Sequence, residues 1–279
     1  MNRIIFENVR DIDLDHIFQC GQCFRWIPED NNDSSSKGRY RGVAGSYFCQ
    51  AELEKNDGFS GTLTLNVTGG DEKFWRDYFD LDRDYGQIKE KLVEQEPRIS
   101  AATREGGGIR ISFIVSQNNN IPRIMKCIEG LCSAFGEPVY RDMDGKTWYS
   151  FPKPEALLGK TEEDLKEIKL GYRDSYIVRA ADKFLKNGIP AGTMEEKRKQ
   201  LLEYHGIGPK VADCIMLFGC REFTAFPVDT WVKTIMNDMY GFEKKDIKGM
   251  QAFARERFGD LRGFAQQYLF YLYRDKGIK

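Results

Sequence analysis

The chain has 279 residues, of which 41% are hydrophobic and 30% charged, and its formal net charge at pH 7 is −1. This composition is ordinary for a globular protein, and the length suits one large domain or two to three small ones. The near-zero charge argues against a protein that coats nucleic acid by bulk charge. It does not exclude a local basic face or a phosphate site lined by backbone amides.

The N-terminal segment carries acidic residues where a signal peptide needs an apolar run, and no later segment is long and apolar enough for a transmembrane helix. We therefore expect a protein without membrane contact that acts in the cytoplasm or at the nucleoid, or in the nucleus of a eukaryote. The seven cysteines are scattered along the chain, which is typical of a reduced protein rather than of a disulfide framework.

The first part of the chain has the pattern of strands. The segment "GTLTLNV" (residues 61–67) alternates apolar and polar side chains, and residues 39–53 are rich in aromatic and β-branched side chains with glycines at turns. A polar loop, residues 29–38, comes before them. These segments predict an antiparallel sheet.

From Glu72 onward, apolar residues recur at helical intervals, in segments separated by proline and glycine. In residues 161–170, Thr161 is expected to cap a helix, with Asp164 three residues on as a variant of the capping box. We predict an α+β protein: an N-terminal antiparallel β-sheet domain with flanking helices in residues 1–98, followed by a mostly helical, two-lobed domain in residues 99–279.

The strongest signal is "LLEYHGIGPKVADCIMLFGC", residues 201–220. A helix is expected to end at Tyr204 or His205, Gly206-Ile207-Gly208 forms a turn, and Pro209 begins the next helix. Two glycines allow a tight turn and a close backbone approach to a phosphate at the following helix N-terminus. A plain helix-turn-helix corner is the alternative, since short glycine motifs match by chance.

Two residues near this turn could carry chemistry. Lys210 lies in the first turn of the second helix, where the helix dipole disfavours a cation, so its amine can be driven toward the nucleophilic neutral form. A lysine that extends into solvent or binds a phosphate is the alternative. Asp229 follows in "FPVDTW" at a proline-marked helix start, where an N-cap is the ordinary role.

The segment "CGQCFRW" (residues 20–26) raises a different possibility, because Cys20 and Cys23 have the spacing of a redox or metal pair. The following residues run into a loop, and no second cysteine or histidine pair stands at zinc spacing. A thiol protein therefore remains a weaker hypothesis.

Taken together, these motifs resemble the helix-hairpin-helix, Gly/Pro-Asp superfamily of DNA glycosylases, and more narrowly the 8-oxoguanine DNA glycosylase/AP lyases. Beside the hairpin near residues 195–220, the match rests on five more stretches in the family's order: "GQCFRW", "SQNNNIPRI", "LGYRDSY", "PVDTW" and "AQQYLF". The resemblance implies a monomer that acts on double-stranded DNA, flips a damaged nucleotide out of the duplex and removes its base.

By this resemblance, Lys210 is the nucleophile that attacks the sugar C1′ and forms a Schiff base, and Asp229 stabilises the positive charge on the sugar. Gln266 and Phe270 match the residues that bind and stack on the base, and Cys214 matches the second stacking position. The main-chain carbonyl of Gly21 would accept a hydrogen bond from the N7–H that 8-oxoguanine has and guanine lacks.

The resemblance also assigns the duplex contacts. Tyr172 would wedge into the stack, whereas Asn118, Arg123 and Arg173 would contact the unpaired cytosine, which implies a preference for cytosine opposite the lesion. Gly206 and Gly208 would approach the backbone. Two positions depart from the usual pattern: His205 in the turn, and Trp231 where many relatives carry a histidine.

No cofactor is implied. A four-cysteine iron–sulfur cluster, present in some relatives after the catalytic region, is not expected because no cysteine follows Cys220. Main-chain carbonyls of Leu202, Tyr204 and Ile207 would hold a monovalent or divalent cation. A non-catalytic protein that uses the hairpin only to bind phosphates is the competing hypothesis for the whole chain.

Overall fold

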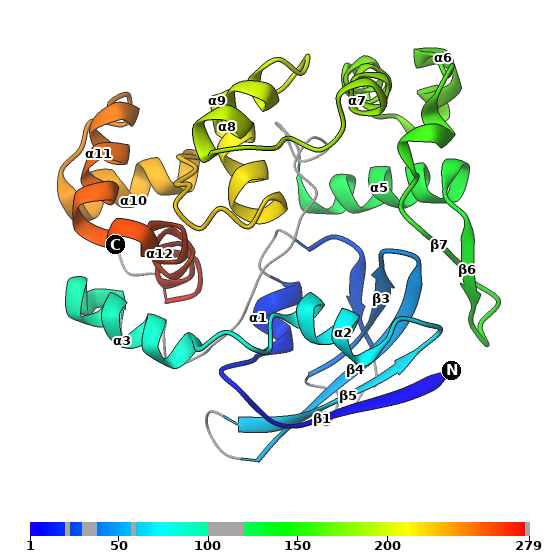
Figure 1. The fold of residues 1–279 in the computed structure, drawn as a ribbon, viewed down its shortest axis with the longest axis horizontal. Coiled ribbons are helices and arrows are strands. Elements are labelled where there is room, and N and C mark those ends of the chain that lie inside the picture. The colour runs from blue at the N-terminus through cyan, green and yellow to red at the C-terminus, as the bar shows by residue number, and fades with distance from the viewer. Residues whose placement is uncertain (20–22, 30–37, 57–59, 100–119, 277–279) are drawn as a thin grey trace. The chain divides into compact units, whose positions relative to one another are not determined.

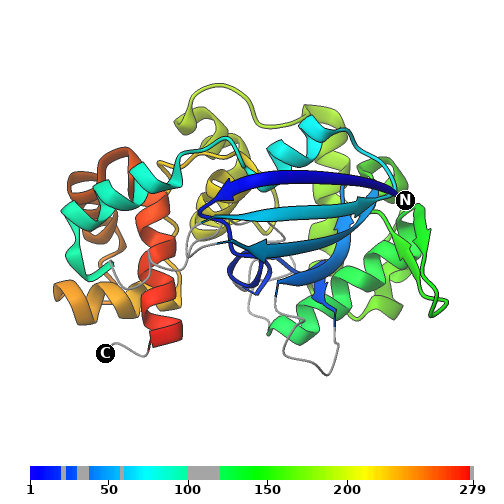
Figure 2. The same ribbon diagram turned by 90° about the horizontal axis from the view of Figure 1, so that it is seen from below.

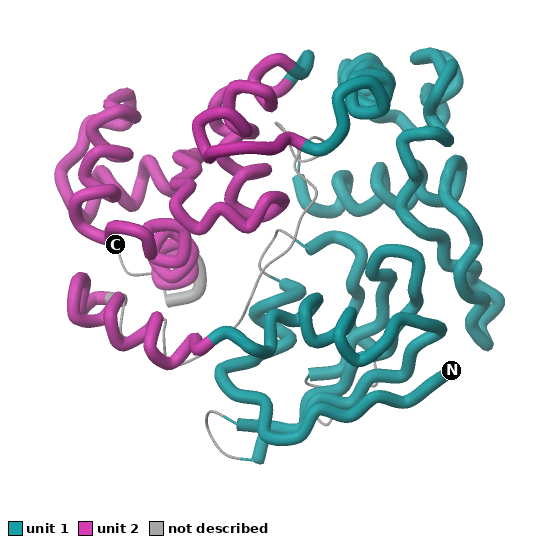
Figure 3. The backbone as a smooth tube through the Cα atoms, viewed as in Figure 1, with its two compact units in different colours: residues 1–83, 107–189, 204–206 teal, residues 84–106, 190–203, 207–279 magenta. Residues whose placement is uncertain are grey.

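The computed structural model describes residues 1–19, 23–29, 38–56, 60–99 and 120–276, and Figures 1 and 2 show its elements from two sides. The chain divides into two compact units (Figure 3). Unit 1 comprises residues 1–83, 107–189 and 204–206, and unit 2 comprises residues 84–106, 190–203 and 207–279. The units therefore interleave along the sequence, and the single boundary near residue 98 stays a prediction.

The N-terminal part of unit 1 is a five-stranded antiparallel sheet with the strand order β1-β5-β4-β3-β2. Its strands are β1 (Asn2–Arg10), β2 (Trp26–Pro28), β3 (Arg39–Ala44), β4 (Tyr47–Lys55) and β5 (Ser60–Val67). In β5, buried and half-buried residues alternate along the whole strand, which is the pattern expected for a strand with one face on a core. The predicted antiparallel sheet is confirmed.

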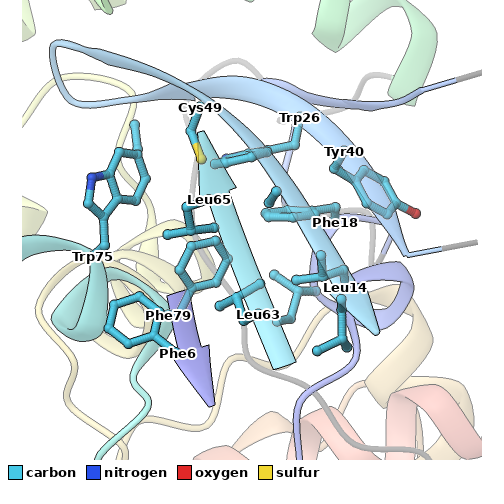
Figure 4. Packing of buried hydrophobic residues seen from close by; sticks show 14 of the residues in the cluster. Phe6, Leu14, Phe18, Trp26, Tyr40, Cys49, Leu63, Leu65, Trp75 and Phe79 are labelled. Atoms are coloured by element: carbon cyan, nitrogen blue, oxygen red, sulfur yellow. The ribbon is translucent and has the colours of Figure 1, made fainter. Parts of the chain in front are cut away.

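One face of this sheet is covered by α1 (Leu14–Phe18) and α2 (Glu72–Phe79), which complete an aromatic core (Figure 4). The rings of Phe18 and Trp26 stack at 4.3 Å, and the side chain of Trp75 is fully buried. Each helix begins at an aspartate whose carboxylate accepts a backbone N–H, as N-caps do. The core therefore contains the side chains that the alternating pattern directs inward.

The opposite face of the sheet meets a two-stranded ribbon, β6 (Pro138–Arg141) and β7 (Thr147–Tyr149). Trp148 of the ribbon packs with Val43 and Phe48 of the sheet, and the ring of Tyr140 stacks on Phe48 at 4.3 Å. Val43 of β3 and Phe48 of β4 are thus buried on this second face of the sheet.

Unit 1 also holds a helical cluster. Its elements are α5 (Ile121–Phe135), η3 (Pro154–Leu157), α6 (Glu162–Leu165), η4 (Lys166–Ile168) and α7 (Arg173–Asn187). The capping box of Thr161 and Asp164 is present, as predicted. The helix itself is shorter than the pattern over residues 161–170 indicates, because a 3₁₀ turn follows α6 and Lys169 takes a left-handed conformation with φ of 61°.

Unit 2 is helical. It contains α3 (Tyr85–Gln95), η2 (Pro97–Ile99), α8 (Met194–Leu202), α9 (Pro209–Cys214), the π-helical turn η5 (Ile215–Gly219), α10 (Thr230–Tyr240), α11 (Ile247–Phe258), η6 (Gly259–Leu261) and α12 (Arg262–Lys276). Helix α12 contacts α10 and α11. A sheet followed by a mostly helical region confirms the α+β class. In the part of the chain that the structure describes, no helix could cross a membrane.

A buried carboxylate in unit 2 connects η2 to α10. Glu96 is 2% exposed and accepts hydrogen bonds from Arg98 Nε at 2.6 Å and from the hydroxyl of Tyr240 at 2.8 Å. Burial acts to raise the pKa of Glu96, but these hydrogen bonds and the positive charge of Arg98 outweigh burial and hold it below its usual value of 4.5. The carboxylate is therefore charged in the folded protein at neutral pH.

Candidate active site

The hairpin consists of α8, a turn at residues 203–208, and α9. Helix α8 ends at Leu202, two residues before the predicted end, and Pro209 occupies the first position of α9 as predicted. Gly206 has φ of +84°, and a Cβ there would lie 2.4 Å from a ring carbon of Tyr176. A glycine is therefore required at the centre of the turn by backbone conformation and by packing.

Lys210, Cys214 and Asp229 come together within unit 2. Lys210 is exposed at the second position of α9 and donates a side-chain hydrogen bond to the sulfur of Cys214, one helical turn later and 4% exposed. The carboxylate of Asp229 is close enough to act electrostatically on the same thiol. The structure thus groups the predicted nucleophile, its predicted carboxylate partner and one predicted stacking residue.

The thiol of Cys214 is neutral in this environment. Burial is the largest cause and raises its pKa to about 12; the positive charge of Lys210 opposes this shift, whereas the charges of Asp229 and Asp213 add to it. A neutral, buried sulfur is a soft apolar surface of the kind that suits stacking on a base.

Asp229 stands at the start of helix α10. Its Oδ1 accepts the backbone N–H of Val232 at 2.8 Å, so it is the N-cap of α10, as predicted. Trp231, in the first turn of that helix, is 49% exposed and meets the ring of Phe270 of α12 edge to face, with centroids 6.1 Å apart and planes at 89°. Helix α10, which Asp229 caps, is therefore in aromatic contact with Phe270, a predicted base-stacking residue.

Gln266 and Phe270 lie one turn apart on α12, as predicted. Gln266 is buried and its carboxamide oxygen accepts a hydrogen bond from Gln267, which orients the amide; Phe270 is half-buried.

Asp213, which lies between Lys210 and Cys214, is a site residue that was not predicted from the sequence. This carboxylate is 6% exposed; it accepts hydrogen bonds from Arg198 Nε of α8 at 2.7 Å and from the amide of Gln251 of α11 at 3.1 Å. Asp213 thereby holds the helix that bears Lys210 against two neighbouring helices. The only available signal was an acidic residue inside an otherwise apolar helical segment.

The predicted readers of the duplex that the structure describes gather in unit 1. Arg123 donates a hydrogen bond to the carbonyl of Lys169 at 3.2 Å, and Arg173 donates one to the carbonyl of Leu170 at 3.0 Å. The guanidinium of Arg173 also lies 4.4 Å from the ring centre of Tyr172, which is 51% exposed. Both arginines therefore converge on the turn that precedes the exposed tyrosine.

Gly21, Cys20 and Asn118 lie outside the described residues, so their predicted roles stay predictions. Cys23 is half-buried and packs against the core of the sheet. Among the described residues, no group of three or more histidine, cysteine, aspartate or glutamate side chains is arranged to hold a metal ion.

The carbonyls predicted to hold a cation are main-chain groups of Leu202, Tyr204 and Ile207, which fall in different units. That cation therefore also stays a prediction.

The fold is a sheet domain joined to a helical region with a Gly-x-Gly hairpin, and the site holds a lysine beside a helix-capping aspartate. These features define the class of protein as a helix-hairpin-helix DNA glycosylase. Two family models match the chain: "8-oxoguanine DNA glycosylase, N-terminal domain" over residues 4–118, and "HhH-GPD superfamily base excision DNA repair protein" over residues 111–259. The chain belongs to the 8-oxoguanine DNA glycosylases of this superfamily.

Individual proteins agree with this membership. The chain is 31% identical to an N-glycosylase/DNA lyase of Saccharomyces cerevisiae over 84% of its own length and 69% of the yeast protein. It is 32% identical to a probable N-glycosylase/DNA lyase of Methanothermobacter thermautotrophicus, over 60% of its own length and 61% of that protein.

A solved structure is similar over nearly the whole chain. It is the 8-oxoguanine glycosylase/lyase of Clostridium acetobutylicum, in complex with double-stranded DNA that contains cytosine opposite 8-oxoguanine. The TM-score is 0.85 at 35% identity, and the similarity covers 99% of this chain and 97% of the other.

Proposed function

We propose that this chain removes 8-oxoguanine paired with cytosine in duplex DNA and then cuts the strand at the abasic site, with Lys210 as the nucleophile. The observation that carries the proposal is the grouping of Lys210 and Asp229, each at the start of a helix, with Cys214 at the end of α9. Membership of the family and the solved relative with its 8-oxoguanine–cytosine DNA support the substrate.

The chemistry follows from this grouping. The Nζ of Lys210 uses its lone pair to form a bond to C1′ as the bond from C1′ to the base nitrogen breaks, and the base leaves with the bonding electrons and takes up a proton. The carboxylate of Asp229 stabilises the positive charge that develops on the sugar. Because Asp229 is held as an N-cap, it is already in place before the charge forms.

Cleavage of the strand, the second half of the reaction, uses the same amine of Lys210. Ring opening of the sugar, in which O4′ takes up a proton from water, gives a protonated Schiff base between Nζ and C1′. Water then accepts a proton from C2′, and the electrons of that C–H bond form a C2′–C3′ double bond as the C3′–O bond breaks and the strand end that carries the phosphate leaves. Hydrolysis of the imine returns the amine of Lys210. The exposed position of Lys210 allows the sugar to reach it.

Borohydride trapping tests this assignment. With DNA that contains 8-oxoguanine opposite cytosine, the wild-type protein should form a covalent adduct, and Lys210→Gln should abolish it. Lys248→Gln is a matched control, because Lys248 is also an exposed lysine at the second position of a helix, α11. An adduct that persists in Lys210→Gln would identify another nucleophile.

The preference for cytosine is proposed to depend on Arg123 and Arg173, whose hydrogen bonds to the carbonyls of Lys169 and Leu170 place two cationic donors beside Tyr172. Cytosine presents acceptors at N3 and O2 that match such donors. Loss of one charge-assisted hydrogen bond in Arg123→Met should lower the ratio of cytosine to adenine in the opposite-base assay by about tenfold. An unchanged ratio would contradict the role of Arg123.

A further inference from the structure

Two aromatic contacts link the hairpin turn, through helix α7, to Tyr172 within unit 1. The ring of Tyr176 meets the ring of His205 edge to face, with centroids 4.9 Å apart and planes at 80°. Tyr176 also meets the ring of Tyr172, with centroids 5.5 Å apart and planes at 66°. The three rings form a continuous series, which we call the Tyr176 ladder, from the hairpin turn to the exposed Tyr172.

The ladder leaves little room for independent movement of its ends. Tyr176 occupies the space where a Cβ of Gly206 would lie, 2.4 Å from a ring carbon, so the turn rests directly on this ring. Farther along α7, Nζ of Lys183 lies 5.1 Å from the ring centre of Tyr204. A displacement of the turn toward α7 must therefore move Tyr176, and with it the ring of Tyr172.

Both ends of the ladder are proposed DNA contacts. His205 and Gly206 belong to the turn proposed to contact the DNA backbone, and Tyr172, which is 51% exposed, is the proposed wedge. A core contact alone would not need three successive aromatic rings that run from a half-buried position to two exposed ones. Edge-to-face pairs have a preferred geometry that aliphatic contacts lack, so they can transmit position.

We propose that Tyr176 and His205 are positioning residues, which set the ring of Tyr172 for entry into the duplex when the hairpin seats on the DNA backbone. The proposal rests on the proposed function, because it takes Tyr172 as the wedge. It assigns a task to His205, one of the positions at which the turn departs from the usual pattern. It requires the aromatic ring of His205, not a charge.

The test separates entry of the wedge from binding of DNA. A 2-aminopurine next to the lesion reports unstacking by stopped-flow fluorescence, and Lys210→Gln protein is used throughout so that no strand is cut. Tyr176→Leu and His205→Ala should each slow the fluorescence rise by about 2- to 10-fold, the range that loss of one or two aromatic pairs implies. Their affinity for undamaged duplex should stay within about twofold of the parent protein.

Conservative variants distinguish position from mere stability. Tyr176→Phe and His205→Phe keep the rings and should retain the parent rate. Tyr140→Leu is the matched control, since it removes a stacked aromatic pair with Phe48 elsewhere in unit 1 and should leave the rate unchanged. A slow His205→Phe would mean that the imidazole itself contacts DNA, which overturns the ladder.

A double-mutant cycle gives the decisive result. In a Tyr172→Leu background, His205→Ala should have no further effect on the rate, because the element that the ladder positions has been removed. Effects that multiply would show that the turn and Tyr172 act independently, and would refute the coupling. If Tyr172→Leu alone leaves the fluorescence rise unchanged, the wedge assignment fails instead, and the ladder fails with it, while the trapping assay of Lys210 is unaffected.

Discussion

Replacing Gly208 with alanine should leave the free protein folded but weaken its binding to DNA. Gly208 has φ of −85° and ψ of 175°, which any residue adopts, and a Cβ built on it meets no atom of the described residues within 4 Å. In the part of the chain that the structure describes, nothing therefore requires a glycine at this exposed position. Gly206 differs, because its φ is +84° and a Cβ would lie 2.4 Å from the ring of Tyr176.

The two alanine variants should differ in how much each lowers the free energy of unfolding. At position 206, the left-handed conformation costs about 1–2 kcal/mol and the clash about 1–3 kcal/mol of unfolding free energy, hence about 2–5 kcal/mol together. At position 208, a poorer N-cap and a less flexible unfolded chain have opposite effects, and the net change should stay within about 1 kcal/mol. If a phosphate approaches the backbone of Gly208, a Cβ should remove a charge-assisted hydrogen bond and cost about 1.5–3 kcal/mol of binding, or about 10- to 100-fold in Kd.

Thermal unfolding and fluorescence anisotropy with duplex DNA measure the two quantities. Gly206→Ala should lower Tm by more than about 5 °C, and Gly208→Ala by less than about 3 °C. Gly208→Ala should nevertheless bind DNA weakly at a temperature where it is folded to the same extent as wild type. Wild-type affinity in Gly208→Ala would refute a backbone contact at this residue.

Three further changes test the site and its support. Asp229→Asn keeps an N-cap side chain but removes the charge, so Tm should change by less than about 2 °C while single-turnover excision slows by at least about 100-fold. A large drop in Tm that accompanies the slower excision would make the role of Asp229 purely structural. Asp213→Ala leaves Arg198 without its buried partner and should lower the unfolding free energy by about 2 kcal/mol, measured by urea titration, whereas no change would show that the network is dispensable. Because the folded pKa of Glu96 lies below 4.5, its stabilising effect is complete above that pH and is lost as the pH falls through the folded pKa; Glu96→Gln should make Tm less sensitive to pH in this range, and an identical pH profile would count against the role of Arg98.

Local patterns in the sequence predicted those features whose causes are local. The alternation in residues 61–67, the capping box at Thr161 and the proline at the start of α9 each depend on neighbours within a few positions, and each is confirmed. The N-cap of Asp229 belongs to the same kind. In these cases the backbone preference and the tertiary contacts require the same conformation.

Features with distant causes were missed. Asp213 pairs with residues 15 and 38 positions away, so no local pattern could reveal that its carboxylate is buried and satisfied. The end of α8 was placed too late because Tyr204 is compatible with a helix; in the structure it is 8% exposed, with Lys183 of α7 5.1 Å from its ring centre. The π-helical turn at residues 215–219 likewise leaves no mark in the apolar segment that forms it.

The hairpin turn is the part of the chain that links the predicted catalytic residues to the predicted readers of the opposite base. Lys210, Cys214 and Asp229 belong to unit 2, whereas Arg123 and Tyr172 belong to unit 1. Between residues 203 and 207 the chain passes from unit 2 into unit 1 and back, so the turn is covalently continuous with the helix of Lys210, the proposed nucleophile, and packs on the helix that follows Tyr172, the proposed wedge. A change in this turn should therefore alter both excision and the reading of the opposite base, whereas a change on α12 should alter excision alone.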